Sequence, residues 1–230
     1  MVHFTLFGIP VYIRPSFWVV LAIFGGALSI SSVEDLIYPA LFVIAGFVAI
    51  LSHEMGHALV GRKLGGGQQT IVLELFGGLT SSHGMQLTRG GRALMILAGP
   101  MMTLLLGIIS LGLTWNIVAP VMTSYNLNFW DLAISPFTAA LFSPKLYILS
   151  CLILIGEWWT ILNLLPIYPL DGGQLIAQYI RSPRKVFMTG FITAILIGLL
   201  SFQLFHGYFI PIFMALFAYS NYREYKNAPF

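Results

Sequence analysis

The residues best suited to chemistry lie close together in an apolar stretch of the chain. His53 and His57 are four positions apart, so on a helix their rings project from one face and can chelate one metal ion. Glu54 follows the first histidine and can serve as general base for a water at that metal. An ionisable group costs about 2.5–3.5 kcal/mol at the centre of a membrane helix, which makes a mere polar helix contact a poor alternative. We therefore predict a metal centre here.

Two histidines leave a hydrolytic metal site incomplete, because such sites use three protein ligands and one open position. The acidic candidates for the third ligand are Glu74, Glu157 and Asp171. Asp171 matches the expected membrane depth of the histidines best, since it follows the fourth apolar stretch at its cytoplasmic end. Pro166 and Pro169 precede it and Gly172 follows it, a pattern that interrupts a helix and lets the chain turn. Broken backbone at this depth indicates a protein-lined or water-filled cavity.

Composition places the chain in a membrane. Of its 230 residues, 58% are hydrophobic and only 8% are charged, whereas soluble domains carry about a quarter charged residues. We predict an α-helical polytopic membrane protein with about six transmembrane helices, at residues 16–30, 37–60, 93–115, 146–165, 186–205 and 208–222. We expect one domain over residues 1–230, with a catalytic core at about 37–175 and peripheral, gating helices at 16–30, 186–205 and 208–222.

The basic residues predict the orientation, because loops rich in lysine and arginine stay cytoplasmic. Of the eleven, only Lys145 falls on the far side of the six predicted spans. We expect both termini to be cytoplasmic, in a prokaryotic plasma membrane, and no cleavable signal peptide at the start. The small positive charge serves orientation, so no nucleic-acid partner is predicted, and the pattern carries no prediction of oligomeric state.

Two segments on the expected cytoplasmic side have the composition of strands. Residues 69–79 are β-branched and apolar and end near Gly77 and Gly78, and residues 1–13 contain a break at Gly8 and Pro10. We predict that the two segments pair into one small sheet at the membrane interface or along a cavity. Two surface hairpins without a function are the alternative.

Two motifs follow one another along the chain, His53-Glu54-x-x-His57 and Asn163-x-x-Pro166-x-x-x-x-Asp171-Gly172. Together they resemble the site-2 protease (M50) family of intramembrane zinc metalloproteases. Two further segments are similar to the β-loop and the third-helix motif of that family, namely Phe76-Gly77-Gly78 and Ala98-Gly99-Pro100. Thr103 departs from the pattern, since many members carry asparagine there. The expected form is minimal, without PDZ or CBS domains.

The resemblance implies a mechanism and a substrate class. His53, His57 and Asp171 would coordinate one zinc ion, and Glu54 would activate the water that attacks a peptide bond within or beside a transmembrane helix of a protein substrate. Asn163 would bind substrate backbone or the developing oxyanion; an interhelical hydrogen bond is its alternative role. The segment at Gly77 and Gly78 would accept extended substrate by strand addition.

The same sequence admits other readings. A membrane protease that trims prenylated proteins also carries the histidine motif, but expects a glutamate as third ligand, and Glu157 lies at the wrong depth for that role. A structural role for Glu157 is therefore predicted. The alternative from another class is a non-proteolytic metal-binding membrane protein, either a transporter or an inactive relative that binds client helices. The intact set of Glu54 and three ligands favours the enzyme.

Overall fold

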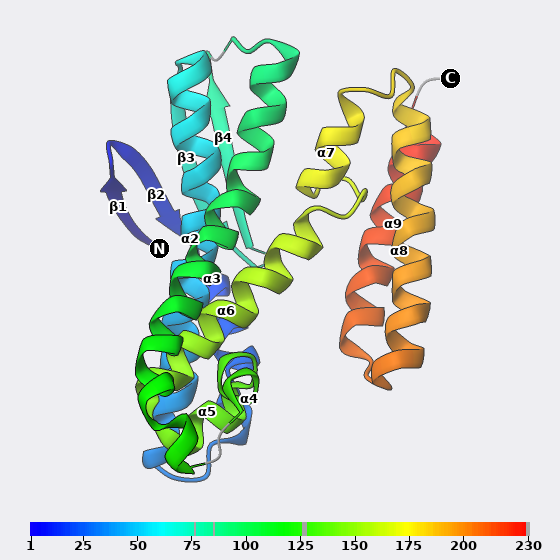
Figure 1. Ribbon diagram of the computed structural model, residues 1–230. Helices are drawn as coiled ribbons and strands as arrows, with labels where there is room; N and C mark the ends of the chain where they lie inside the picture. Colours follow the sequence, from blue (N-terminus) through cyan, green and yellow to red (C-terminus); the bar gives the residue numbers. More distant parts are fainter. Residues whose placement is uncertain (76, 85, 126–127, 229–230) are drawn as a thin grey trace. The chain divides into compact units, whose positions relative to one another are not determined.

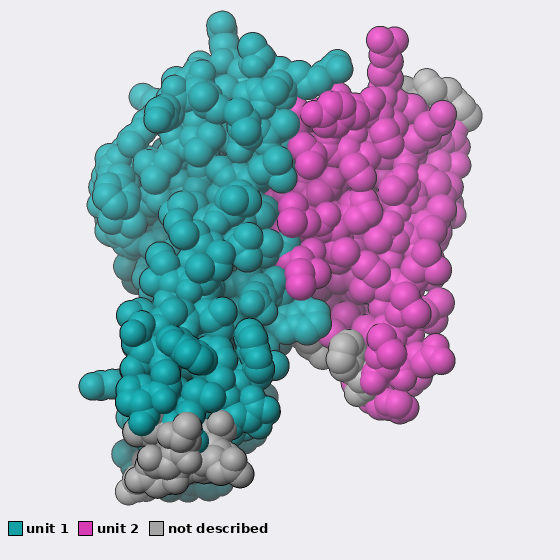
Figure 2. Space-filling view, viewed as in Figure 1, with its two compact units in different colours: residues 1–160 teal, residues 161–230 magenta. Residues whose placement is uncertain are grey.

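A computed structural model describes residues 1–75, 77–84, 86–125 and 128–228 of the chain. Phe76, part of the predicted β-loop motif, lies outside the described residues. The chain packs as two compact units, residues 1–160 and residues 161–230, which Figure 2 shows in different colours.

The first unit combines a small sheet with long helices (Figure 1). Its strands are β1 (Val2–Leu6), β2 (Ile9–Ile13), β3 (Gln68–Glu74) and β4 (Gly77–His83). Its helices are α1 (Pro15–Phe24), α2 (Ile37–Gly65), α3 (Arg89–Tyr125), α4 (Phe129–Ala133) and α5 (Pro136–Phe142), together with most of α6 (Pro144–Asn163). Two short 3-10 turns, η1 (Ala27–Ser29) and η2 (Glu34–Leu36), lie between α1 and α2.

The four strands form one sheet in the order β1-β2-β3-β4. The hairpins β1-β2 and β3-β4 are antiparallel, and β2 joins β3 in parallel, with Val11 opposite Ile71 and Ile13 opposite Leu73. These four side chains are buried, and they pack against apolar residues of α1 and α2. The prediction that the two strand-like segments form one small sheet is confirmed.

Four of the described helices are long and apolar enough to cross a membrane, at Ile37–Gly65, Arg89–Pro120, Pro144–Asn163 and Pro183–Leu204. The predicted count of six spans is not confirmed. The helix expected at residues 16–30 ends at Phe24, because Gly25 and Gly26 follow and Gly26 adopts a φ of 89°. A helix of 10 residues spans about 15 Å, half of a hydrocarbon core of about 30 Å.

The third predicted span, by contrast, is longer than expected. Helix α3 runs on to Tyr125 instead of ending near residue 115, and it contains Pro100 and Pro120. Pro100 has no N–H to donate to the carbonyl of Ile96, one turn earlier in the helix. The hydroxyls of Thr103 and Thr160 lie 3.0 and 3.3 Å from the carbonyl oxygen of Pro100 itself.

The second unit contains α7 (Asp171–Ala177), α8 (Pro183–Phe205) and α9 (Phe209–Asn227). Helices α8 and α9 lie side by side as a helical hairpin (Figure 1), and their core contains Ala194, Met214 and Ala218. The last turns of α9 carry Arg223, Glu224 and Lys226, so this helix is not among the four apolar spans.

Candidate metal centre

The two predicted histidine ligands lie on one face of α2, and this face packs tightly against α3. His53, His57 and Gly61 share this face because they follow one another at intervals of four residues, and Gly56 lies three residues after His53. A Cβ atom at Gly56 would overlap the Ala98 carbonyl oxygen, and one at Gly61 would lie 3.0 Å from a methionine sulfur of α3. Glycine at these positions therefore lets the two helices approach closely, as small residues do in membrane helix packing.

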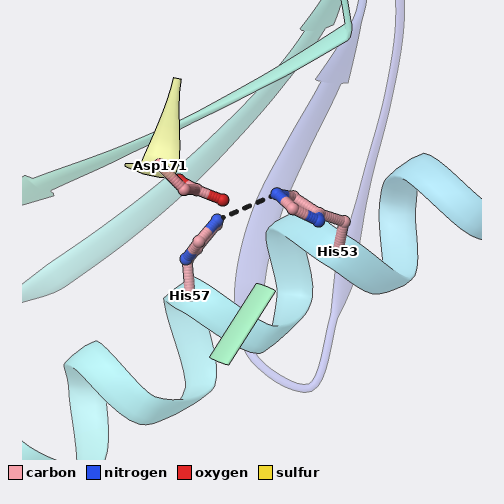
Figure 3. Close-up of side chains that lie close together, drawn as sticks. All are labelled: His53, His57 and Asp171. Carbon is pink, nitrogen blue, oxygen red and sulfur yellow. Dashed lines mark hydrogen bonds between the residues drawn. The ribbon is translucent and has the colours of Figure 1, made fainter. Parts of the chain in front are cut away.

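The two histidines of this face converge. Their Nε2 atoms lie 3.1 Å apart, and both side chains are buried (Figure 3). His57 Nδ1 lies 2.8 Å from the carbonyl oxygen of Met95. A carbonyl oxygen only accepts, so Nδ1 donates its hydrogen there and Nε2 is left with its lone pair toward His53. A backbone carbonyl leaves no mark in the sequence, which is why this partner of His57 was not predicted.

Gly99 in α3 leaves room for the imidazoles. A Cβ atom at this position would overlap Nε2 of His57 and would lie 2.9 Å from Nε2 of His53. The absence of a side chain at Gly99 therefore leaves a space, here called the cradle, beside the nitrogen atoms that would bind a metal. Any larger residue at this position would fill the cradle.

Glu54 lies beneath the sheet. It is 5% exposed, and its carboxylate Oε2 accepts a hydrogen bond of 2.7 Å from the hydroxyl of Thr80 in β4. A Cβ atom at Gly78, two residues earlier in the strand, would overlap the Glu54 side chain. Residues 78 and 80 share one face of β4 because strand side chains alternate. The contact of Thr80 with Glu54 was not predicted from the sequence. The two-residue spacing of Thr80 from Gly78 was the feature that could have indicated it.

Asp171 begins α7 in the second unit and is buried. Cβ atoms at Gly172 and Gly173 would overlap backbone atoms of Leu164 and Ile167, so the first turn of α7 packs directly on the segment after α6. This segment also receives two side-chain hydrogen bonds within the unit. Gln174 Nε2 donates to the Pro169 carbonyl at 2.9 Å, and Asn221 Nδ2 donates to the Tyr168 carbonyl at 2.6 Å.

One set of histidine and acidic side chains in the described part of the chain could hold a metal ion, namely His53, His57 and Asp171 (Figure 3). Each of the three is buried, and each offers one ligand atom. Two imidazole nitrogens and a carboxylate oxygen are a donor set that suits zinc. The cradle at Gly99 and the anchored Nδ1 of His57 also fit a metal held by the Nε2 atoms.

The other predicted residues lie at the ends of elements, between helices or inside α3. Asn163 is the buried last residue of α6, and Pro166 follows it in the segment before α7. Gly77 opens β4 at a φ of 125°, and a Cβ atom there would press on the Trp159 ring. Pro100 lies inside α3.

Thr103 and Glu157 occupy contrasting environments. Thr103, which replaces the expected asparagine, is buried, and its hydroxyl lies 2.7 Å from that of Thr160. It therefore links α3 to α6. Glu157 is exposed on the surface of the first unit.

These features define a class, an integral membrane protein whose apolar helix carries a buried His-Glu-x-x-His motif, as metalloproteases do. Residues 41–205 match peptidase family M50, and the chain belongs to this family.

Individual relatives agree with this assignment. The chain is 28% identical over 227 residues to the zinc metalloprotease MJ0392 of Methanocaldococcus jannaschii, a match over 94% of this chain and 57% of the relative. It is 29% identical over 191 residues to the putative zinc metalloprotease sll0528 of Synechocystis, covering 76% of this chain and 43% of the relative. This chain thus spans only about half the length of these two relatives.

A solved structure shares the fold. The site-2 protease from Methanocaldococcus jannaschii matches with a TM-score of 0.61 and 25% sequence identity, over 97% of this chain and 94% of the solved chain. The predicted membership of the site-2 protease family and the predicted fold class, helical with a small sheet, are confirmed.

Proposed function

We propose that this chain is a zinc-dependent intramembrane endopeptidase, which hydrolyses a peptide bond within or near a transmembrane helix of a membrane-protein substrate. The observation that carries the proposal is the buried pair His53 and His57, with Glu54 beside them, on a helix apolar enough to cross a membrane. Membership of peptidase family M50, and relatives named as zinc metalloproteases, support the same activity.

We assign one zinc ion per chain to His53, His57 and Asp171, whose atoms are buried and chemically suited to it. When bound, zinc supplies Lewis acidity, which polarises a carbonyl group and makes a neighbouring water more acidic. The Met95 carbonyl orients the His57 ring for this role through Nδ1.

Glu54 is the proposed general base. Its carboxylate takes a proton from the attacking water and later returns it to the leaving amine of the cleaved bond. Burial favours this exchange, because charges interact more strongly where water is scarce. Asn163 is proposed to donate from its amide to substrate backbone or to the developing oxyanion.

The edge of β4 is the proposed docking site for the substrate chain. β4 is the last strand in the sheet order and is hydrogen-bonded to β3 on one side. An extended segment of substrate can add to its other side through main-chain hydrogen bonds, which demand little of the substrate side chains. Gly78 brings this strand against Glu54, so a docked chain would lie near the general base.

The sequence supports a topology for this activity. Ten of the eleven basic residues lie on one side if all six predicted segments cross the membrane, the short α1 and the charged α9 included, so we propose that both termini face the cytoplasm of a prokaryotic cell. Labelling of cysteines placed near either terminus in right-side-out vesicles tests this. The proposed orientation requires that they react only after permeabilisation.

The deciding experiment is a comparison of wild type with Glu54→Gln. Both proteins are purified, their zinc content is measured, and cleavage of a single-span substrate is followed in proteoliposomes. Glu54→Gln should retain zinc and lose at least about 10²-fold in rate, the range of general acid–base catalysis. Glu157→Gln is the matched control, because Glu157 is exposed on α6 and should leave the rate unchanged. Equal rates for wild type and Glu54→Gln would refute the proposed mechanism.

A further inference from the structure

The hydroxyl of Thr80 lies within hydrogen-bond distance of both the carboxylate and the backbone carbonyl of Glu54. Its Oγ1 is 2.7 Å from the carboxylate Oε2 and 3.1 Å from the backbone carbonyl oxygen of the same residue. A hydroxyl has one hydrogen to donate, and a carboxylate is the stronger acceptor, so the shorter bond is the charge-assisted one. Thr80 thus connects the strand β4 to the side chain that is proposed to move the proton.

The strand geometry explains how a threonine reaches this position. Thr80 pairs with Ile71 and Gly78 pairs with Leu73 across the β3-β4 hairpin. Both partners are fully buried, which places residues 78 and 80 on the face of the sheet that packs against α2. Gly78 leaves space for the Glu54 side chain, and Thr80 lies one pleat further along the same face.

The contact also restricts what the carboxylate can do. A glutamate side chain has three rotatable bonds, and fixing one oxygen by a hydrogen bond restricts all of them. With Oε2 held by Thr80, Oε1 is the oxygen left to accept a proton. A base held in one orientation is more effective than one that samples several, since proton transfer needs close and aligned atoms.

We propose that Thr80 is a positioning residue for Glu54: its hydroxyl fixes the carboxylate so that Oε1 faces the reacting water. This inference rests on the proposed peptidase function. It adds a residue of the sheet to the machinery of hydrolysis, and it gives β4 a second role beside the docking of substrate.

If Thr80 had a purely structural role, its hydroxyl would matter only as a donor to the backbone carbonyl of Glu54 in α2. The test therefore compares Thr80→Val, which keeps the branched shape and the strand preference, with Thr80→Ser, which restores the hydroxyl. Thr5→Val is the matched control, because Thr5 lies in β1, the other edge strand of the same sheet. Zinc content, thermal unfolding, kcat and KM are measured for each purified protein in proteoliposomes.

We expect Thr80→Val to lower kcat by about 10- to 100-fold, the effect of a misplaced catalytic group, with KM, zinc content and unfolding temperature close to wild type. Thr80→Ser should recover most of kcat, and Thr5→Val should match wild type. A kcat of Thr80→Val within twofold of wild type would overturn the inference. So would a Thr80→Ser variant as slow as Thr80→Val.

An infrared measurement gives a readout that does not depend on activity. Glu54 is one of only eight acidic residues, and its antisymmetric carboxylate stretch is identified as the band that Glu54→Gln removes. Loss of the hydroxyl donor should shift this band in Thr80→Val and leave it in place in Thr5→Val. An unshifted band would overturn the inference even if kcat fell.

The outcomes separate this inference from the function on which it rests. If wild type and Glu54→Gln cleave equally fast, the peptidase mechanism fails, whatever Thr80 does. If Glu54→Gln is inactive and Thr80→Val is as fast as wild type, the peptidase function stands and the positioning role of Thr80 is wrong.

Discussion

Asn221 in α9 donates a hydrogen bond of 2.6 Å from Nδ2 to the carbonyl oxygen of Tyr168, in the segment that leads to Asp171. The same amide also donates to the Phe217 carbonyl at 2.9 Å, within its own helix. A Cβ atom at Gly190 of α8 would overlap the Asn221 side chain, so α8 packs directly over this contact. Helices α8 and α9 thus hold the backbone that carries the predicted aspartate ligand.

Replacing Asn221 by alanine should therefore destabilise the second unit. The change removes this partly buried hydrogen bond to the Tyr168 carbonyl, which costs about 0.5–1.5 kcal/mol. The free energy of unfolding, measured by titration with a denaturing detergent, checks the value. Asn227→Ala is the control, because Asn227 is exposed at the end of the same helix and should change little. A stable Asn221→Ala variant would contradict the role given to this bond.

Gly99→Ala should weaken zinc binding while the protein still folds. The added methyl group would occupy the cradle at Nε2 of His57 and His53. We expect zinc affinity to fall by at least about tenfold, comparable to the loss of a supporting group around a metal. Metal analysis of the purified protein measures this.

Gly112→Ala is the matched control in the same helix, since a Cβ atom there would meet nothing within 4 Å. It should bind zinc like wild type and gain about 0.5–1 kcal/mol of stability from the alanine. Equal zinc content in Gly99→Ala and Gly112→Ala would show that the cradle does not limit metal binding.

Asp171→Asn tests the third ligand. An amide is a weaker zinc ligand than a carboxylate, so the affinity for zinc should fall by about tenfold or more. Competition with a chelator of known affinity measures the change. The control is Asp131→Asn, in the first turn of α4. Zinc removal from wild type should abolish cleavage and zinc addition should restore it; an Asp171→Asn variant that keeps wild-type affinity would exclude Asp171 as a ligand.

A substrate with a weakened helix should be cleaved faster. A helical peptide keeps its amides in its own hydrogen bonds, so it must unwind locally before it can pair with the edge of β4. A Gly-Pro pair introduced near the scissile bond removes helix stability. We expect a several-fold gain in kcat/KM over an otherwise identical substrate with Ala-Ala. Equal rates would argue against strand docking as the route to cleavage.

The sequence predicted the family and the fold class more reliably than the lengths of the elements. His53, Glu54 and His57 are recognisable because charged residues are rare in the chain and because two histidines four residues apart lie on the same face of a helix. The pairing of two strand segments was also predictable from their composition. Helix ends were harder to predict, since Gly25 and Gly26 stop α1 early while α3 continues through Pro100 and Pro120.

The contacts around the site were not predictable for a different reason. The Met95 carbonyl that anchors His57 is backbone, and every residue has one. Thr80 reaches Glu54 only because the hairpin register puts it on the inner face beside Gly78. A sequence shows which side chains of a strand share a face. The register of the sheet decides which of these side chains contact the helix that packs on that face.

The parallel pairing of β2 with β3 sets an order for assembly during synthesis. β2 leaves the ribosome well before its partner, because α1 and α2 are made in between. At about 5–20 residues per second, the hairpin β1-β2 waits roughly 3–11 s with the outer edge of β2 unpaired. The sheet therefore closes only after α1 and α2 have been made, so Glu54 is covered by β4 after its own helix is complete and before α3 to α6 are made.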